Sequence, residues 1–204
     1  SSREFLDSRG LDYEEGDLGP VYGFQWRHFG AEYKDFNTDY TDKGSDQLKY
    51  IINLIKNDPN SRRIIMSSWN PPDIDKMALP PCHVLCQFNV DTKNKRLDCQ
   101  LYQRSGDMFL GVPFNIASYS LLVCIFSEIL DLKPGDFIWT GGDCHIYNNH
   151  FEQAKEQIQR KPMQLPTLQI PKFNSIEEVL KSTPKDFKLI DYNPMKSINA
   201  PMAV

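Results

Sequence analysis

Two stretches in the middle of the chain have the hydrophobic pattern of β-strands. Residues 83–90 form a largely apolar run, and residues 97–104 alternate apolar and polar positions and end in a guanidinium. The polar segment 91–96 between them predicts a hairpin connection. If the two strands pair antiparallel around this tip, Cys82 before the first strand lies at the same end of the ladder as Arg104.

Apolar residues at helical spacing predict further elements. Residues 46–57 place four aliphatic side chains on one face, with Ser45 or Asp46 as the N-cap. Residues 114–130 are apolar almost all round, which predicts a buried central helix. Weaker patterns predict strands at residues 64–69, 136–140 and 187–190, a turn at 132–135, helices at 149–160 and 175–182, and an extended piece within 161–172.

These elements together predict the α/β class. The expected architecture is a mixed β-sheet that carries Cys82 and is packed by the central apolar helix. The second face of this sheet is expected to be used for dimerisation.

Cys82 is the first candidate for chemistry. Pro80 and Pro81 fix φ and cannot donate ladder hydrogen bonds, so the chain reaches Cys82 by a rigid, non-helical approach. A cation such as Arg104 beside a thiol lowers its pKa from about 8.5 toward neutrality and makes it a nucleophile. A single cysteine more often only packs in a core, so spacing alone leaves both interpretations open.

The composition is that of one globular domain. A length of 204 residues fits a single domain, and 40% hydrophobic with 12% aromatic residues excludes a disordered chain. The formal net charge of −4 argues against a protein whose main task is binding nucleic acid, which requires a basic face.

Cysteine usage and hydropathy indicate the compartment. The five cysteines are odd in number and lie mostly in apolar patterns, which favours reduced thiols in a cytoplasmic protein. Cys82 and Cys86 have no second pair at ligand spacing, so no zinc site is expected. No signal peptide opens the chain, and polar residues interrupt the apolar stretch 114–130, so no membrane association is expected.

Three longer motifs carry a resemblance to a known family. Pro-Pro-Cys-His at residues 80–83, Gln-Arg-Ser-Gly-Asp at 103–107 and Gly-Val-Pro-Phe-Asn-Ile-Ala-Ser-Tyr at 111–119 resemble thymidylate synthase, and the resemblance extends over essentially the whole chain. It implies one catalytic domain, residues 1–204, that lacks the N-terminal portion of the usual domain.

The resemblance also implies an activity. It is the reductive methylation of dUMP by 5,10-methylenetetrahydrofolate, which yields dTMP and dihydrofolate. The folate is both carbon donor and reductant, so the implied reaction needs neither nicotinamide nor metal.

Several residues have implied catalytic roles. Cys82 is the nucleophile that adds to C6 of the pyrimidine, and Arg104 binds the phosphate and favours the thiolate. Asn115 reads the uracil edge, with a helix cap as its ordinary alternative. Tyr22 orders water near the pyrimidine, with core packing as its alternative.

The remaining implied contacts fall into two sets. His145 and Tyr147 lie two residues apart, so on an extended segment they share a face and reach one sugar hydroxyl, although such a pair is more often a buried polar network. The implied dUMP contacts are Arg62, Arg63, His83, Gln103, Arg104, Ser105, Gly106, Asp107, Asn115, His145 and Tyr147. The implied folate contacts are Asp107, Leu110, Gly111, Phe114 and Ala203.

Arg62 and Arg63 imply a partner subunit. Adjacent strand residues point to opposite faces, so a surface role is the ordinary expectation for at least one of them. In the resembling family this pair reaches the partner's site and grips the nucleotide phosphate, which implies a homodimer. The resemblance also leaves open a fusion to dihydrofolate reductase.

Four positions depart from the family's usual pattern. Trp139, Gly141 and Cys144 stand where that family has His, Leu and Ala, and Phe109 stands where it has glycine. These differences bear on the local shape of the pocket. The terminal Met-Ala-Val, which includes Ala203, is expected to close over bound ligands.

Three other functions are compatible with parts of the sequence. A pyrimidine hydroxymethylase would share the thiol addition and omit hydride transfer. A noncatalytic dimeric scaffold or RNA binder is the second, and the acidic balance weakens its RNA version. A thiol redox protein is disfavoured because the sequence has no Cys-x-x-Cys motif.

Overall fold

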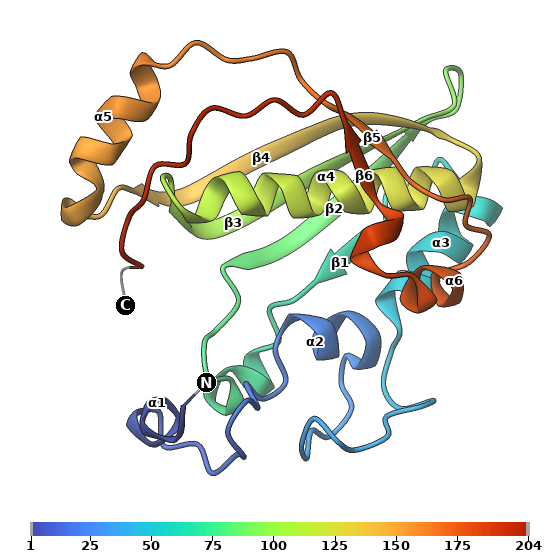
Figure 1. The fold of residues 1–204 in the computed structure, drawn as a ribbon. Helices are drawn as coiled ribbons and strands as arrows, with labels where there is room; N and C mark the ends of the chain where they lie inside the picture. The colour runs from blue at the N-terminus through green and yellow to red at the C-terminus, as the bar shows by residue number, and fades with distance from the viewer. Residues whose placement is uncertain (1, 203–204) are drawn as a thin grey trace.

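The computed structural model describes residues 2–202 and contains the predicted mixed sheet (Figure 1). Four strands follow the order β1-β2-β3-β4, of which the first three pair antiparallel and β3 with β4 pairs parallel. Their bounds are β1 (Ile65–Ser67), β2 (His83–Asp91), β3 (Arg96–Asp107) and β4 (Lys133–His145). A parallel pair needs a long crossover, and α4 (Gly111–Leu130) supplies it.

The central hairpin has the predicted register. Asp91 faces Arg96 across the tip, and Lys95 adopts the left-handed conformation that a tight turn requires. At the other end of the hairpin, the backbone N–H of Arg104 donates to the backbone carbonyl of Cys82 over 2.9 Å. The prediction that Cys82 and Arg104 lie at the same end of the ladder is confirmed.

β4 is much longer than the predicted strand 136–140. It begins at Lys133, so the predicted turn at 132–135 is wrong, and Pro134 lies opposite Leu97 within the ladder. The ladder is irregular between Leu97 and Cys99, and there the Asp98 carboxylate accepts the Asp136 N–H over 2.7 Å, which accommodates the proline. As a result, β4 runs beside β3 to the end of both strands.

α4 packs along the sheet, and its two halves differ in burial. Leu122, Phe126 and Ile129 are buried, whereas Phe114 at the start of the helix is 73% exposed. The prediction that this helix is buried on all sides is therefore wrong for the first turns of α4, which are partly exposed in the structure of residues 2–202. By length and composition alone α4 could cross a membrane, and 44% of its most apolar window is buried inside the fold.

The main core lies between the sheet, α4 and α3 (Gln47–Asn57). α3 begins after Asp46, whose carboxylate accepts the Lys49 N–H, as the sequence predicts. Its aliphatic face packs on the buried faces of the strands, for example on Phe88. A smaller cluster, formed by Leu6, Leu11 and Ala78, lies under the N-terminal segment.

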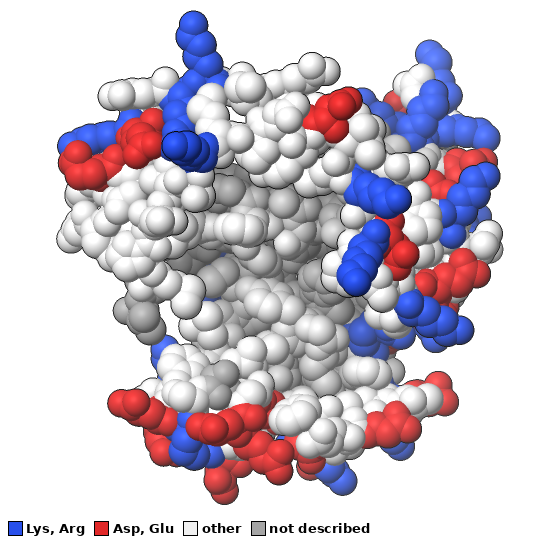
Figure 2. Space-filling model, in the orientation of Figure 1, with Lys and Arg blue, Asp and Glu red and all other residues white. Residues whose placement is uncertain are grey.

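The other elements are short and surround this core. The predicted helices at 149–160 and 175–182 and the predicted strands at 64–69 and 187–190 are confirmed with shorter bounds. The short elements around the core are α1 (Arg3–Ser8), α2 (Tyr22–His28), η1 (Pro71–Lys76), η2 (Asn148–His150), α5 (Phe151–Gln159), β5 (Thr167–Gln169), α6 (Ile176–Lys181), η3 (Pro184–Asp186) and β6 (Lys188–Ile190). On the face in Figure 2, acidic side chains gather over the lower part and few charges lie in its hollowed middle.

Candidate active site

A cavity of about 330 Å³ lies at the end of the sheet where Cys82 enters β2. Ten residues line it, and all ten belong to the sets that the sequence predicts. They are Tyr22, Cys82, His83, Gln103, Ser105, Asp107, Gly111, Asn115, His145 and Tyr147. Residues from α2, β2, β3, α4 and β4 therefore meet at one place around the candidate nucleophile.

Arg104 holds the approach to Cys82. Its guanidinium donates to the carbonyl oxygens of Pro81 and Pro80 over 2.9 and 3.0 Å and lies 5.5 Å from the centre of the Trp69 ring. Because both proline carbonyls bind the same planar guanidinium, the backbone that leads to Cys82 has little freedom to move. Sequence analysis missed this structural contact, and the effect of Arg104 on the thiol and on a phosphate stays a prediction.

Tyr22 anchors the backbone at Cys82 from the opposite side. The N–H groups of Cys82 and His83 donate to the Tyr22 hydroxyl oxygen over 2.7 and 3.3 Å. Burial raises the pKa of Tyr22, with a smaller contribution from the neighbouring Cys82 thiol, so the phenol keeps its proton at neutral pH. The Tyr22 O–H is thus available to donate a hydrogen bond into the cavity.

Removing this hydroxyl is expected to impair both chemistry and local order. The Tyr22→Phe variant leaves two backbone N–H groups without an acceptor, and we expect a kcat lowered by about tenfold or more and a loss of about 1–2 kcal/mol of stability. Tyr40→Phe is the matched control, because the Tyr40 hydroxyl also accepts two backbone N–H groups, from Lys34 and Asp35. Equal losses of kcat in both variants would contradict a specific role for Tyr22.

Three amide and ring groups form a chain beside the cavity. The Trp139 indole N–H donates to Gln103 Oε1 over 2.8 Å, and Gln103 Nε2 donates to Asn115 Oδ1 over 2.9 Å. Asn115 lies inside α4, which begins at Gly111, so the alternative of a helix cap is wrong. Burial lowers the pKa of His83, and a hydrogen bond with Asn115 opposes this only in part, so the imidazole is neutral at pH 7.

Asp107 and the end of β4 form the far side of the cavity. Asp107 Oδ1 accepts the N–H groups of Phe109 and Leu110 over 3.0 and 3.3 Å, and so satisfies donors just before α4. The rings of His145 and Tyr147 meet edge to face at 5.0 Å, which confirms that they share a face. His145 Nδ1 lies 2.9 Å from Asp143 Oδ1.

Six of the predicted residues that the structure describes do not line this cavity: Arg62, Arg63, Arg104, Gly106, Leu110 and Phe114. Arg62 and Arg63 are exposed at a separate hollow that they share with Asp58, Asn60 and Ser61. The neighbouring Ile65 faces Gln87, five residues along β2 from Cys82. Leu110 lines another cavity, and Phe114 is exposed.

Gly106 packs behind the cavity wall, where an added Cβ would lie 3.0 Å from Val112 Cγ2. Ala203, a predicted folate contact, lies outside the described residues.

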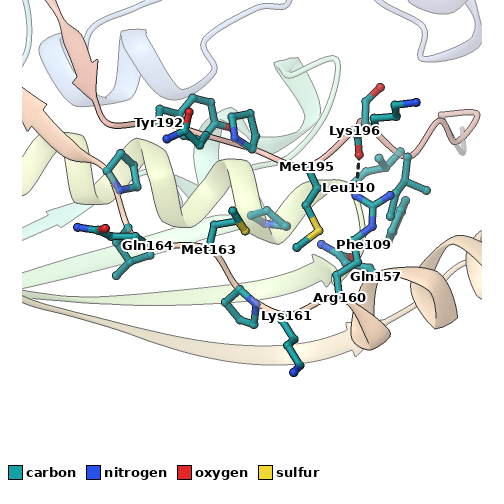
Figure 3. Close-up of a pocket in the computed structure, with 18 residues that line it drawn as sticks. Phe109, Leu110, Gln157, Arg160, Lys161, Met163, Gln164, Tyr192, Met195 and Lys196 are labelled. Carbon is teal, nitrogen blue, oxygen red and sulfur yellow. Dashed lines mark hydrogen bonds between the residues drawn. The ribbon is translucent and has the colours of Figure 1, made fainter.

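The cavity that Leu110 lines is larger, about 530 Å³ (Figure 3). It lies between the start of α4, α5 and the segments 160–166 and 192–198. Of the three cationic residues that line it, Arg160 donates to the Lys196 carbonyl over 2.6 Å and pairs with Glu156. Since no cysteine or histidine among residues 2–202 lines this larger cavity, the smaller cavity around Cys82 is the candidate active site.

Two of the four residues that differ from the family's usual pattern, Phe109 and Trp139, form contacts that the sequence did not predict. Phe109 lies 5.5 Å from the ring of His150, and His150 Nε2 lies 2.6 Å from the Pro201 carbonyl oxygen. His150 is fully buried and ties the C-terminal segment to η2. Trp139 forms the second such contact, a hydrogen bond to Gln103. In the sequence, only the unusual identity of residue 139 indicated that this position could matter.

Comparison with known proteins gives a consistent match. The sequence model of the family described as thymidylate synthase matches residues 3–204. Thymidylate synthases of human herpesvirus 8 and of Homo sapiens are each 58% identical to this chain over 204 residues. The bifunctional dihydrofolate reductase-thymidylate synthase of Zea mays is 57% identical over 206 residues. Each match covers 100% of this chain, which spans 59%, 64% and 39% of these relatives, respectively.

Proposed function

Since this chain belongs to the thymidylate synthase family, we propose that the protein converts dUMP and 5,10-methylenetetrahydrofolate to dTMP and dihydrofolate. The observation that carries the proposal is the single cavity in which Cys82 meets Tyr22, Asn115, His145 and Tyr147. Such a cavity suits a pyrimidine nucleotide, because a thiol can attack the base, the Asn115 amide can bind the base edge, and His145 and Tyr147 can bind a sugar hydroxyl.

The first chemical step is addition of the Cys82 thiolate to C6 of the pyrimidine. The new S–C6 bond displaces electron density onto C5 and O4, and C5 becomes the carbon that attacks the one-carbon unit. The Asn115 amide N–H donates to O4 as its charge develops, and the Tyr22 O–H orders water nearby. The hydrogen bonds to the backbone of Cys82 support this assignment because they hold the thiol in one position.

Methylenetetrahydrofolate, when bound, supplies both the one-carbon unit and the hydride that reduces it, and leaves as dihydrofolate. Loss of the C5 proton to the ordered water comes before hydride transfer, because the electron pair of that bond expels the folate nitrogen from the one-carbon unit. Hydride transfer then completes the methyl group, and elimination of the Cys82 thiolate restores the C5–C6 double bond. The start of α4 is the proposed folate site, with Asp107 as the pterin partner and Leu110, Gly111, Phe114 and Ala203 as neighbouring contacts. The adjacency of Gly111 and Leu110, which line neighbouring cavities, supports this placement.

The phosphate site is proposed to need a second copy of the chain. Arg104 and Ser105 would bind the phosphate together with Arg62 and Arg63 from the partner. The latter two are exposed away from Cys82 of their own chain, and within residues 2–202 neither forms an ion pair. A planar guanidinium fork suits phosphate oxygens.

The outer face of the sheet is the proposed dimer interface. It alternates with the buried face along each strand, and four apolar residues on it are 37–46% exposed. They are Ile65, Leu85, Tyr102 and Ile138. A sheet face with exposed apolar residues on all four strands fits burial against a second copy. The free state of all five cysteines supports a cytoplasmic location.

Product analysis tests the proposed reaction. The full-length protein is incubated with dUMP and methylenetetrahydrofolate, and nucleotide and folate products are separated by chromatography. We expect dTMP and dihydrofolate in equal amounts without added nicotinamide. A 5-hydroxymethyl nucleotide with tetrahydrofolate would show a hydroxymethylase, and no modified nucleotide at all would contradict both enzymes.

A further inference from the structure

We propose that Trp139 is a positioning residue that, through Gln103, fixes the side-chain amide of Asn115 in the orientation that selects uracil over cytosine. This proposal rests on the proposed function, because it takes Asn115 as the residue that reads the pyrimidine edge. It concerns one of the four positions that depart from the usual family pattern, and it follows from a chain of hydrogen bonds with only one possible polarity.

The polarity of the chain begins at the indole. An indole N–H can donate but cannot accept, so the atom of Gln103 that faces Trp139 over 2.8 Å must be the oxygen Oε1. Gln103 Nε2 then donates to the Ser105 carbonyl and to Asn115 Oδ1, each over 2.9 Å. Gln103 is 2% exposed and has partners for all its polar groups, so no water competes for them.

The orientation of Gln103 fixes that of Asn115. Because Gln103 presents a donor, Asn115 must turn its oxygen toward it, and reversing the Asn115 amide would bring two NH₂ groups face to face. In the fixed orientation Asn115 Nδ2 donates to O4 of uracil, and Oδ1, the acceptor of the Gln103 bond, is turned to the side of the N3–H. Cytosine presents an amino donor and an N3 acceptor, which require the reversed amide. Reversal at Asn115 would force reversal at Gln103, against the indole.

The indole fits only because two glycines lie beside it. A Cβ at Gly141 would collide with Cη2 of Trp139 and with Sγ of Cys144, and a Cβ at Gly106 would lie 3.3 Å from Trp139 Cζ2. Trp139 and Gly141 thus form one compensated pair, in which the large ring occupies the space that a side chain at position 141 would fill. Any side chain at position 141 would push the indole away from Gln103.

The decisive variant is Trp139→Phe, which removes the donor and keeps an aromatic ring. Trp26→Phe is the matched control, because the Trp26 indole N–H donates over 2.8 Å to Ser68 Oγ, away from Asn115. Dissociation constants for dUMP and dCMP are measured by calorimetry on the full-length proteins, and the ratio of the two constants is the readout. We expect this ratio to fall by about 10- to 100-fold in Trp139→Phe, because a buried Gln103 oxygen is left without a donor, and to stay unchanged in Trp26→Phe.

Two further variants keep the test independent of folding problems. Trp139→His keeps a ring N–H and is expected to recover most of the preference for dUMP. Gly141→Leu keeps Trp139 and is expected to lose that preference through displacement of the indole. An unchanged dUMP to dCMP ratio in folded Trp139→Phe, or equal losses in both the Trp139→Phe and Trp26→Phe variants, would overturn the proposal. Wild-type dTMP formation is assayed in parallel, so a wild type that makes no dTMP but keeps its nucleotide preference refutes the proposed reaction alone.

Discussion

The Cys82→Ala variant is expected to lose at least about 10⁴-fold in kcat, because Cys82 supplies the bond to C6 of the pyrimidine and no second thiol among residues 2–202 lines the cavity. Binding of dUMP should change little, since the amide, hydroxyl and imidazole groups that line the cavity remain in place. Steady-state assay of dTMP formation and calorimetry with dUMP measure the two quantities separately.

Cys124→Ala is the matched control for this variant. Cys124 lies half-buried on α4, and burial raises the pKa of its thiol, so it is not expected to act as a nucleophile. Its kcat should stay within about twofold of the wild type. Retention of substantial dTMP formation by folded Cys82→Ala would refute the assignment of the nucleophile.

The double variant Arg62→Ala/Arg63→Ala is expected to lose about 10²- to 10³-fold in kcat/KM for dUMP, because two charge-assisted phosphate contacts disappear. The effect should reach the partner's site and not the variant's own. When this double variant is unfolded together with Cys82→Ala and refolded as a mixture, heterodimers should each contain one complete site. A statistical mixture then regains roughly a quarter of the wild-type activity.

The control for this experiment is Lys93→Ala/Lys95→Ala, which removes two exposed cations from the hairpin tip. It should leave kcat/KM for dUMP unchanged, which would show that removing two exposed cations from the surface does not by itself impair the reaction. A refolded mixture of Cys82→Ala and the arginine variant that stays as inactive as its components would show that the arginines do not act across a subunit boundary.

Short-range patterns predicted the central hairpin. The apolar run 83–90, the alternation on 97–104 and the polar tip between them predicted two antiparallel strands, and their pairing brings Cys82 next to Arg104. The family resemblance implied a set of site residues that includes all ten around the cavity, and eight of these ten lie on five separate elements, while their roles stay predictions. Periodicity alone carries no information on how such distant segments meet.

Long-range packing decided the features that were predicted wrongly. The strand β4 includes Pro134 and Gly135, residues that usually mark a turn, because the neighbouring Asp98 on β3 accepts the Asp136 N–H. The exposed start of α4 has the same apolar composition as its buried end, so composition could not separate the two halves of the helix.

The contacts of Arg104 and Trp139 show the same limit for side chains. The sequence indicated a guanidinium near a thiol, but the atoms that it binds are the carbonyls of Pro80 and Pro81. Trp139 stood out only as an unusual residue, and its partner Gln103 lies 36 positions earlier in the chain. Such pairings depend on the β3–β4 register, which no local pattern specifies.

Mass spectrometry of the full-length protein with 5-fluoro-dUMP and methylenetetrahydrofolate tests the central claim most directly. Fluorine replaces the C5 hydrogen that must leave, so the reaction should stop as a covalent complex of enzyme, nucleotide and folate. We expect the intact mass to rise by both ligands, the modified peptide to contain Cys82, and the Cys82→Ala variant to show no adduct. A wild-type protein that is folded, binds dUMP and forms no adduct would contradict the proposed reaction.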